Sequence, residues 1–495
     1  MSNLSGTMSA LPLRVIGERI TSSQLNSVTW RVVEQIGQEV KPVLRVATFC
    51  AGSDGFIWGL GALNQSMQAE WGEMYDIAHV ASVDISKDCL KFIKANHKPK
   101  ILVSDMDYMT AEQVWDHMSA EFQDVPKPHI IVIGISCRDI SLKNAKRSRN
   151  GDILTTGGGS TGLTFHLLCK FLDSDNGSEV VEVLMENVAT MFHSATRGQI
   201  ATYRQQVQSA LDARRFFEVA ERKMDPYPST SVHRPRWWAA YLRLPLQDPN
   251  AIPHPLNPYE LPKIQDIINF FNESLDASHK ALAFTNRMQV LRETFKPDDD
   301  PEVVQQEAYR LARFYRLHRN NPTQPNQNFS WVNEHMKYFR DNGVAWVTPI
   351  FHKNHCGRCQ YPGYEVLEDS CGSYAEMSDR QKHMLLFLDS AFPLTYETQI
   401  QITDFSQDGN YINPVEYNSC LVIAPHSTMV LRRMNKSPRL VLGTEKMMLQ
   451  GMPHDFDKAG LSQAQLGKIA GNAFHVVDAM QMTFPALYAA SRVLS

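Results

Sequence analysis

Short apolar runs alternate with amphipathic stretches along the first half of the chain. Six runs have the length and the aliphatic content of buried strands. They read VLRVATF from residue 43 onward, then AHVASVDI, ILVSDM, HIIVIGIS, VVEVLMENV and RPRWWAAYLRL. Segments of helical period separate them, such as SKDCLKFIKANH after the second run. Strands that alternate with helices predict an α/β fold with a mainly parallel sheet.

Polar residues follow five of these runs at the point where each predicted strand ends. The turn CAGSDG follows the first run, and Asp84, Asp105, Cys137 and Glu186 end or follow the next four. Ligands of parallel α/β sheets bind at the carboxyl ends of the strands. The pattern therefore predicts a site built from these residues at one edge of the sheet.

Each of these features also has a plainer structural interpretation. A glycine-rich turn such as CAGSDG holds a nucleotide-like ligand or simply reverses the chain. Asp84 and Asp105 are placed to accept hydrogen bonds from a ligand such as a ribose diol, or to cap the helix that follows. Cys137, beside Arg138 at a strand exit, is either an activated thiolate or an ordinary thiol. The residues alone leave these alternatives open.

The alternating pattern ends near Arg243. A proline-rich segment follows, LPLQDPNAIPHPLNPYELP, with the composition of a linker. Beyond it the pattern is mixed until about Lys436, after which ordered α/β character returns. We expect four parts: an N-terminal extension (1–42), a catalytic domain with the strand-end residues (43–245), a second domain (246–436), and a C-terminal segment that returns to the catalytic domain (437–495).

Composition narrows the class of protein further. The 495-residue chain is long enough for more than one domain, and its formal net charge is -4. Contacts with phosphate would therefore have to come from local basic patches. We expect no membrane span, because no apolar run is long enough to cross a bilayer. We expect no secretory leader, because the N-terminus lacks a basic region followed by a continuous apolar one. Eight scattered cysteines indicate reduced thiols. These features favour an intracellular protein.

Taken in order, the strand-end segments resemble the motif series of the cytosine-C5 DNA methyltransferases. The series here is CAGSDGF, VDISKDCL, SDM, GISCRDIS, MENV, VHRPRWWAAYLR, RLVLGTEKMMLQGMPHDF and KIAGNAFHVVDAM. The last two segments are the most persuasive, and the resemblance covers about 43–243 and 437–485. The sequence departs from the family pattern at several positions: Ser136 replaces a proline, Asp54 a glycine, and Arg138 and Val232 each a glutamine, and Ala470 is inserted.

The resemblance implies a Rossmann-like S-adenosylmethionine-dependent methyltransferase sheet, with the middle domain as a smaller inserted target-recognition domain. It assigns Cys137 as the thiolate that adds to C6 of cytosine, so that C5 attacks the methyl group of the cofactor. Glu186 would contact ring N3 and the amino group. Asn187 would hold the cysteine loop, and Arg234 and Arg236 would stabilise the carbonyl oxygen or position that loop.

The cofactor implied by the resemblance is S-adenosyl-L-methionine, bound over the CAGSDG turn. Asp84 would lie at its ribose and Asp105 at its adenine amino group. The implied cofactor-binding residues are Cys50, Ala51, Gly52, Ser53, Gly55, Asp84, Ile85, Asp105, Met106, Ser136 and Asn472.

The implied partner is DNA, with RNA as the alternative, because the tRNA-acting branch shares the catalytic domain. A cytosine stacked in a duplex cannot reach Cys137, so a duplex substrate requires base flipping. A third interpretation is a catalytically inactive relative that binds nucleic acid or a partner enzyme. In a eukaryote a DNA-modifying enzyme would act in the nucleus. The loop after the nucleophile is a phosphate-contacting loop or a plain solvated one, and its basic residues are Lys143, Lys146, Arg147 and Arg149.

Two weaker patterns lie in the middle domain. Arginines recur every three residues at 310, 313, 316 and 319, which favours a solvated helix face over a phosphate-binding stripe. The segment HKNHCGRC has metal-like spacing, although ordinary loop cysteines are favoured over structural zinc. The zinc alternative involves His352, Cys356, Cys359 and Cys371.

Overall fold

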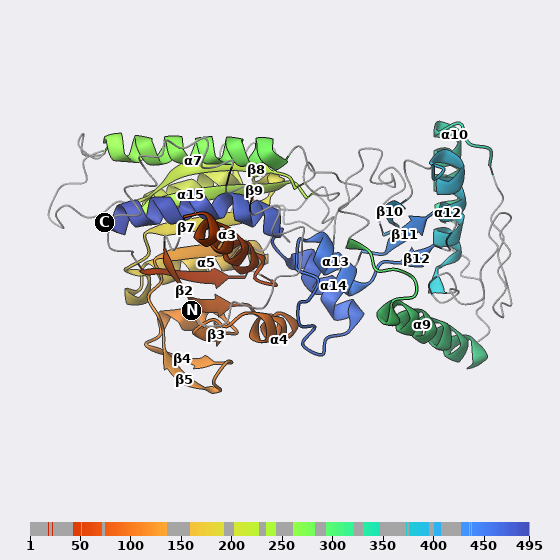
Figure 1. The fold of residues 1–495 in the computed structure, drawn as a ribbon, viewed down its shortest axis with the longest axis horizontal. Coiled ribbons are helices and arrows are strands. Elements are labelled where there is room, and N and C mark those ends of the chain that lie inside the picture. Colours follow the sequence, from red (N-terminus) through yellow and green to blue (C-terminus); the bar gives the residue numbers. More distant parts are fainter. Residues whose placement is uncertain are drawn as a thin grey trace.

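A seven-stranded sheet lies at the centre of the larger domain (Figure 1). The structure is a computed structural model. Helices pack on both faces of this sheet. The residues that it describes are 18, 22, 43–50, 52–71, 75–135, 159–192, 202–226, 234–243, 261–282, 294–320, 330–346, 373, 376–395, 400–406, 427–434, 436 and 438–494.

The strands of this sheet follow the order β3-β2-β1-β6-β7-β9-β8. Neighbouring strands from β3 to β7 run parallel, whereas β9 is antiparallel to both β7 and β8. The mainly parallel α/β fold expected from the sequence is therefore confirmed. The bounds are β1 (Val43–Phe49), β2 (Asp76–Val83), β3 (Ile101–Val103), β6 (Ile130–Gly134), β7 (Glu182–Val188), β8 (Phe216–Met224) and β9 (Arg236–Arg243).

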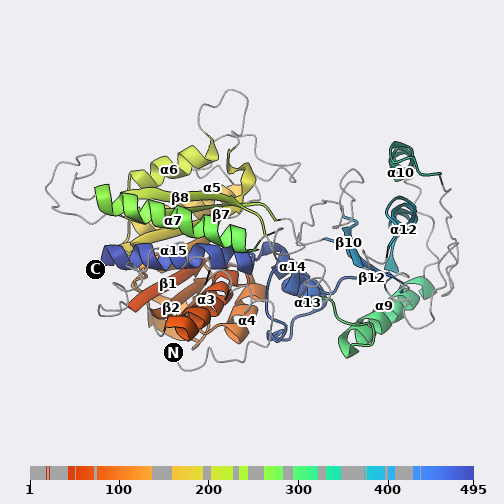
Figure 2. The same cartoon turned by 45° about the horizontal axis from the view of Figure 1, so that its top comes forward.

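Because helices cover both faces, the central strands are apolar on both sides. Along β6, Ile130 and Val132 point into one core, and Ile131 and Ile133 point into the other. Helices α3, α7 and α15 lie on the first face, and α5 and α6 lie on the second (Figure 2). The helices of this domain are α3 (Gly55–Trp71), α4 (Lys87–Asn96), α5 (Gly159–Leu172), α6 (Tyr203–Asp212), α7 (Leu261–Leu282) and α15 (Val476–Leu494), with the 3-10 turns η1 (Met106–Thr110), η2 (Asp175–Gly177) and η3 (Ala189–Phe192).

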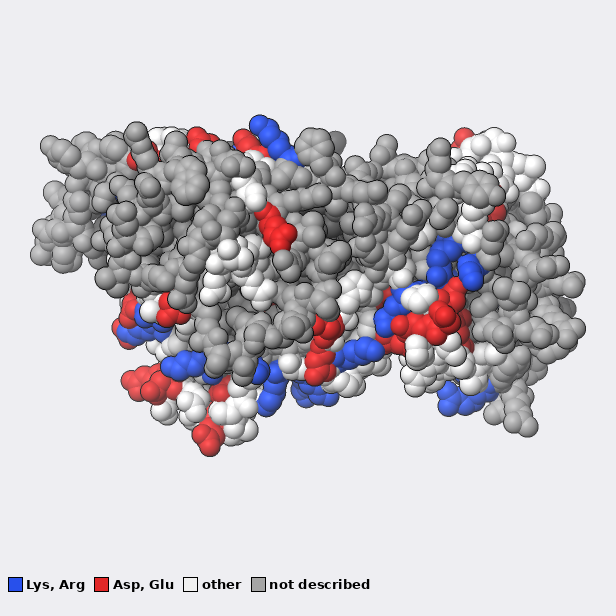
Figure 3. All heavy atoms as spheres, viewed as in Figure 1, with Lys and Arg blue, Asp and Glu red and all other residues white. Residues whose placement is uncertain are grey.

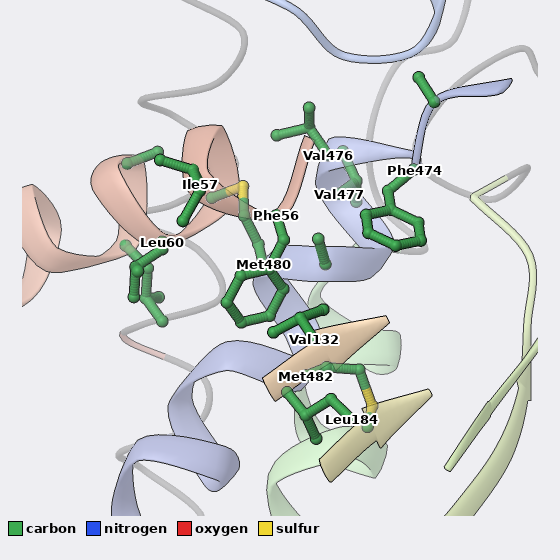
Figure 4. Packing of buried hydrophobic residues seen from close by; sticks show 14 of the residues in the cluster. Phe56, Ile57, Leu60, Val132, Leu184, Phe474, Val476, Val477, Met480 and Met482 are labelled. Atoms are coloured by element: carbon green, nitrogen blue, oxygen red, sulfur yellow. The ribbon is translucent and has the colours of Figure 1, made fainter. Parts of the chain in front are cut away.

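Helix α15 brings the C-terminal end of the chain onto the middle of the sheet. Figure 4 shows Val476 and Met480 of α15 close to Phe56 of α3, above strands β6 and β7. Helix α7 lies along the other side of α15, where the ring of Phe270 stacks on Tyr488 at a centroid distance of 3.9 Å. The helix that follows the proline-rich segment in sequence thus packs on the larger domain.

A second, antiparallel sheet forms a smaller domain at the other end of the molecule (Figure 2). Its core lies between this sheet and two helices, where Phe339, Leu388 and Val430 are buried. Helices α13 and α14 lie between the two sheets (Figure 1). The remaining bounds are β4 (Gln113–Asp116), β5 (Glu121–Asp124), β10 (Ile400–Asp404), β11 (Met429–Arg433), β12 (Arg439–Leu440), α9 (Pro301–Asn320), α10 (Ser330–Asp341), α12 (Asp379–Ala391), α13 (Gly443–Leu449) and α14 (Gln463–Asn472). Within the described ranges, no helix has the length and apolar character needed to cross a bilayer.

Glu182, the first residue of β7, is fully buried, and neither carboxylate oxygen has a hydrogen-bond partner within the described part of the chain. Burial raises the pKa of this carboxyl well above its ordinary value, so the folded state retains a proton that the unfolded chain releases. The contribution of Glu182 to stability is therefore expected to be fully present below the ordinary carboxyl pKa and to be lost as the pH rises toward the raised folded value.

Replacement of Glu182 by methionine is expected to stabilise the protein by roughly 1–3 kcal/mol at pH 8, because a buried unpartnered polar group is removed. The gain should shrink at pH 5, where the glutamate is already protonated. Urea unfolding at both pH values measures the difference, and Glu182→Gln separates the loss of charge from the gain of an apolar side chain. An equal effect of Glu182→Met at the two pH values would contradict the buried-acid interpretation.

Candidate active site

The turn after β1 is held in a shape that glycine favours. Cys50, Gly52 and Asp54 all have left-handed backbone angles, with φ of 53°, 62° and 60°. Such angles are rare outside glycine, although aspartate tolerates them better than most residues. The alternating left-handed positions fold the turn tightly between the end of β1 and the start of α3.

This turn packs directly on the segment that precedes α15. A Cβ atom built on Gly52 would lie 2.8 Å from the carbonyl oxygen of Asn472, and one on Gly55 would lie 2.6 Å from that of Phe474. Real Cβ atoms do not approach backbone so closely, so both positions require glycine. Two predicted cofactor-binding segments more than 400 residues apart in the chain are therefore in contact.

Asp84, at the end of β2, joins the turn to the next helix. Its carboxylate accepts hydrogen bonds from the backbone N–H of Gly52 at 3.1 Å and of Ser86 at 2.8 Å. The helix-cap alternative for Asp84 is wrong, because Ser86 caps α4 by accepting a hydrogen bond from the N–H of Cys89. Burial raises the pKa of Asp84 to about 6. The next side chain, Ile85, is 81% exposed.

Asp105 lies after β3, and its cap interpretation is confirmed, because it accepts a hydrogen bond from the N–H of Asp107 at the start of η1. Asp105 is also close enough to the turn for its charge to act on Cys50. Burial is the main cause that raises the pKa of the Cys50 thiol to about 12, and the charges of Asp84 and Asp105 add to the rise. Met106 beside it is buried. The turn, Asp84 and Asp105 therefore meet at the carboxyl edge of the sheet.

Asp54, which stands where the family pattern has glycine, has its own buried partners. Its carboxylate accepts a hydrogen bond from Ser82 Oγ at 2.5 Å and lies 3.7 Å from His79 Nε2. Burial lowers the pKa of His79 to about 4, so this imidazole is neutral at physiological pH. A neighbouring histidine, His97, is buried and contacts the carbonyl oxygen of Ser53 at 3.0 Å. The polar residues inside the apolar run AHVASVDI are the sequence signal for this network.

Glu186 lies near the end of β7 and is paired with an arginine of the neighbouring strand. Arg236 Nε lies 2.8 Å from Glu186 Oε1. Burial raises the pKa of the Glu186 carboxyl, while the charges of Arg236 and Arg234 oppose that rise. The result is a carboxyl that is shielded from solvent and held in one orientation.

Arg234 acts on a different segment, because it is buried and donates through Nη2 to the carbonyl oxygen of Ala473 at 2.7 Å. Its backbone N–H donates to Asp225 at the end of β8. Asn187 donates through Nδ2 to the carbonyl oxygen of Ile135 at 3.2 Å, and so ties β7 to the end of β6. The two predicted arginines therefore have different surroundings, one at the carboxyl and one at the C-terminal segment.

The arginine series of α9 is partly committed to contacts inside the smaller domain. Arg310 pairs with Glu307 at 2.8 Å, and Arg313 lies 3.4 Å from Glu376. On the face drawn in Figure 3, described basic side chains lie among acidic ones and not in a field of one sign. Arg313 is half exposed, as a solvated helix face requires, whereas the side chain of Arg310 is largely buried and does not fit the solvated-face prediction.

Several predicted site residues lie outside the residues that the structure describes. They are the nucleophile Cys137, the cofactor-binding candidates Ala51 and Ser136, the basic loop residues Lys143, Lys146, Arg147 and Arg149, and the zinc candidates His352, Cys356, Cys359 and Cys371. Within the described ranges, no group of three or more His, Cys, Asp or Glu residues is arranged to hold a metal ion.

No protein-family model matches this sequence, and no curated protein is significantly similar to it. Solved structures are similar to the chain at low sequence identity. A triple mutant of DNMT2 from Spodoptera frugiperda is 14% identical with a TM-score of 0.39, covering 89% of this chain and 98% of that one. The S. pombe Dnmt2 methyltransferase is 14% identical with a TM-score of 0.41 and the same coverage. The methyltransferase EhMeth of Entamoeba histolytica is 10% identical with a TM-score of 0.41, covering 90% and 98%.

Proposed function

We propose that this chain transfers a methyl group from S-adenosylmethionine to C5 of cytosine in DNA. The observation that supports the proposal is that the end of β6, from which the chain continues to Cys137, lies beside both Glu186 and the turn after β1. Gly134 of β6 is paired in register with Glu186, and a Cβ on Gly134 would lie 2.9 Å from the carbonyl oxygen of Cys50. Cys137 follows Gly134 by three residues, so chain connectivity keeps their Cα atoms within about 11 Å.

The proposed chemistry assigns the nucleophile to Cys137. Its thiolate adds to C6 of the cytosine ring, which makes C5 electron-rich. S-Adenosylmethionine, when bound, supplies an electrophilic methyl group. Glu186 presents a proton to ring N3 and so offsets the charge that develops on the ring. Loss of the C5 proton to water and departure of the thiolate restore the aromatic ring, and ring N3 returns its proton to Glu186.

The surroundings of Glu186 suit this role. A carboxyl has to be protonated to donate to N3, and burial favours the protonated form of Glu186. Arg236 restrains the carboxyl from one side. A general acid that is shielded from water and held by a neighbour needs little reorganisation when the substrate arrives.

The residues of the turn fit an adenosine-containing cofactor. Asp84 and Asp105 offer carboxylate oxygens, which accept hydrogen bonds from a ribose diol and an exocyclic amino group. The exposed side chain of Ile85 lies next to Asp84 in the chain and offers an apolar surface to a base. Asn472 packs on Gly52 from the C-terminal segment.

Asp84→Ala is expected to weaken S-adenosylmethionine binding by roughly 1–3 kcal/mol, the typical contribution of a hydrogen bond to a charged group. Titration calorimetry measures the change. Asp76→Ala is the matched control, because Asp76 is an exposed aspartate at the opposite end of the same strand. Equal affinity of Asp84→Ala and the wild type would remove Asp84 from the cofactor site.

The proposal extends to the nucleic acid. A duplex cytosine has to be flipped out of the stack to reach Cys137. The basic loop from Lys143 to Arg149 would contact phosphates, and the smaller domain built on β10, β11 and β12 would read the target. In a eukaryotic cell this activity belongs in the nucleus.

Covalent trapping tests the proposed function. A 5-fluorocytosine duplex DNA and a matching RNA are each incubated with the protein and cofactor, because the fluorine cannot leave as the C5 proton does. An adduct with DNA is expected on a denaturing gel. An adduct with RNA alone would show that the substrate is RNA, as in the tRNA-acting branch, and not DNA. No adduct with either would favour the inactive, nucleic-acid-binding alternative.

A further inference from the structure

Asp54 joins the turn after β1 to helix α3 and stands where the family pattern has glycine. It is fully buried, and its φ of 60° lies in the left-handed region. Aspartate tolerates this region better than most residues, but glycine adopts it without strain. A buried carboxyl at such a position therefore has to be held by contacts that glycine cannot make.

The main contact of the Asp54 side chain is with a serine of β2. Ser82 is also fully buried and donates through Oγ to Asp54 Oδ2 at 2.5 Å. The same Oγ atom lies 3.1 Å from Thr48 Oγ1 of β1 and 2.9 Å from His79 Nε2 of β2. Ser82 is thus the centre of a buried network that connects both strands to the turn.

The two residues before Asp54 are hydrogen-bonded to the same part of the chain. Asp84 accepts the backbone N–H of Gly52 at 3.1 Å, and His97 Nε2 lies 3.0 Å from the carbonyl oxygen of Ser53. Gly52 and Ser53 are held through their backbones, whereas Asp54 is held through its side chain. Replacement of Asp54 by glycine therefore removes one contact of the turn and leaves the other two in place.

Both ends of the turn are bonded to adjacent residues of β2. At the start of the turn, the N–H of Cys50 donates to the carbonyl oxygen of Val83 at 2.7 Å. At its end, the Asp54 side chain is bonded to Ser82, and the Asp54 carbonyl oxygen accepts the N–H of Ile57 at 2.9 Å, which begins α3. The contact between Asp54 and Ser82 therefore fixes the turn relative to β2 and to α3 together.

The network holds Asp54 by hydrogen bonding and not by an ion pair. His79 Nε2 lies 3.7 Å from Asp54 Oδ2, but burial lowers the pKa of this imidazole to about 4, so it is neutral near pH 7. Burial also lowers the pKa of His97. Asparagine tolerates left-handed angles and offers an amide oxygen to the Ser82 hydroxyl, so it can take the place of Asp54 in this contact.

We propose that Asp54 and Ser82 form a positioning pair that sets the shape of the turn for S-adenosylmethionine. Their hydrogen bond keeps Asp54 in the left-handed angle and keeps the turn against β2. A turn that already has its bound shape loses less entropy when the cofactor arrives. The effect on the cofactor rests on the proposed function, whereas the restraint on the turn does not.

Amide hydrogen exchange of the full-length protein without cofactor tests the restraint. In Asp54→Gly and in Ser82→Ala, the amides of Cys50 and Gly52 are expected to exchange on the order of tenfold faster, because the turn opens more readily. The amides of β6 should exchange as in the wild type. Either variant tests the restraint, so failure of one to fold leaves the other. Unchanged exchange of the turn in the variant that folds would overturn the proposal.

Calorimetry with S-adenosylmethionine tests the effect on the cofactor. Asp54→Gly is expected to weaken the affinity on the order of tenfold. Its urea unfolding midpoint should stay near that of the wild type, because relief of the left-handed angle offsets the lost hydrogen bond and Ser82 keeps Thr48 and His79 as partners. Asp54→Asn should bind within about threefold of the wild type. A lower midpoint with unchanged affinity in Asp54→Gly would show a purely structural role and overturn the proposal.

The double variant Asp54→Gly with Ser82→Ala tests whether the two residues act as a pair. It should bind the cofactor no more weakly than the weaker single variant, because both changes remove the same hydrogen bond. Additive losses of affinity would overturn the pairing.

Ala120→Gly is the matched control for the backbone effect. Ala120 is exposed, precedes β5 and has a φ of 59°, so glycine relieves the same kind of angle away from the turn after β1. Its cofactor affinity should equal that of the wild type, and a loss as large as in Asp54→Gly would overturn the proposal. Absence of cofactor binding by the wild type would instead refute the proposed function, and hydrogen exchange would still decide whether Asp54 and Ser82 restrain the turn.

Discussion

Cys137→Ser is expected to lower methyl transfer by at least on the order of 10³-fold and to abolish the covalent adduct, because a serine hydroxyl is scarcely ionised near neutral pH. Cofactor affinity and the unfolding transition should stay close to wild type. The expectation depends on the position of Cys137 three residues after Gly134, which is paired in register with Glu186. Activity is followed as transfer of a labelled methyl group, and cofactor binding is followed by calorimetry.

Cys169→Ser is the control for this substitution. Cys169 is a free cysteine of α5, buried in the core on the other face of the sheet, and burial raises the pKa of its thiol to about 11. Its replacement should leave the rate within about twofold, since a buried thiol with a raised pKa is not a nucleophile. Near-wild-type activity of Cys137→Ser, or equal loss in both variants, would contradict the assignment of the nucleophile.

The parallel part of the sheet could be predicted because its strands are buried on both faces. Their sequences are continuous apolar runs, and each ends in a polar residue at the same edge. Strand β8 was not predicted, because it is an edge strand whose outward residues are charged. Glu218 and Glu221 of this strand both pair with Arg204 of α6. The β4–β5 hairpin was missed for a similar reason, since its strands are only four residues long and β5 is largely exposed.

Only those site residues that lie at the ends of strands could be predicted from the sequence. Asp84, Asp105 and Glu186 lie at the ends of apolar runs, so the sequence alone places them at the carboxyl edge of the sheet. His475 and Asp478 could not, because HVVDAM has the apolar spacing of an ordinary core helix. Their place near Arg234 and Arg236 depends on how α15 crosses the sheet, which is a long-range contact that no local pattern encodes.

Loss of the buried Arg439–Glu445 pair is expected to have the largest effect on stability. Arg439 of β12 donates to both carboxylate oxygens of Glu445 in α13, at 2.8 and 2.6 Å. The same carboxylate accepts the backbone N–H of Leu442 at 2.8 Å and of Lys296 at 3.0 Å. Both charged side chains are almost fully buried. The Glu445 carboxylate thus links two segments of the smaller domain, β12 and the residues before α9, to helix α13, which leads back to the larger domain.

Glu445→Ala is expected to destabilise the protein by roughly 3–5 kcal/mol, because it leaves a buried guanidinium and two backbone N–H groups without acceptors. The double variant Arg439→Met with Glu445→Leu should recover part of that loss, since no unpaired charge remains. Lys170→Ala breaks the exposed pair with Asp107 and should cost no more than about 1 kcal/mol. Denaturant unfolding measures all three, and amide hydrogen exchange should report the loss first in β12 and the segment before α9. If Glu445→Ala cost no more than Lys170→Ala, the pair would not be what joins the two domains.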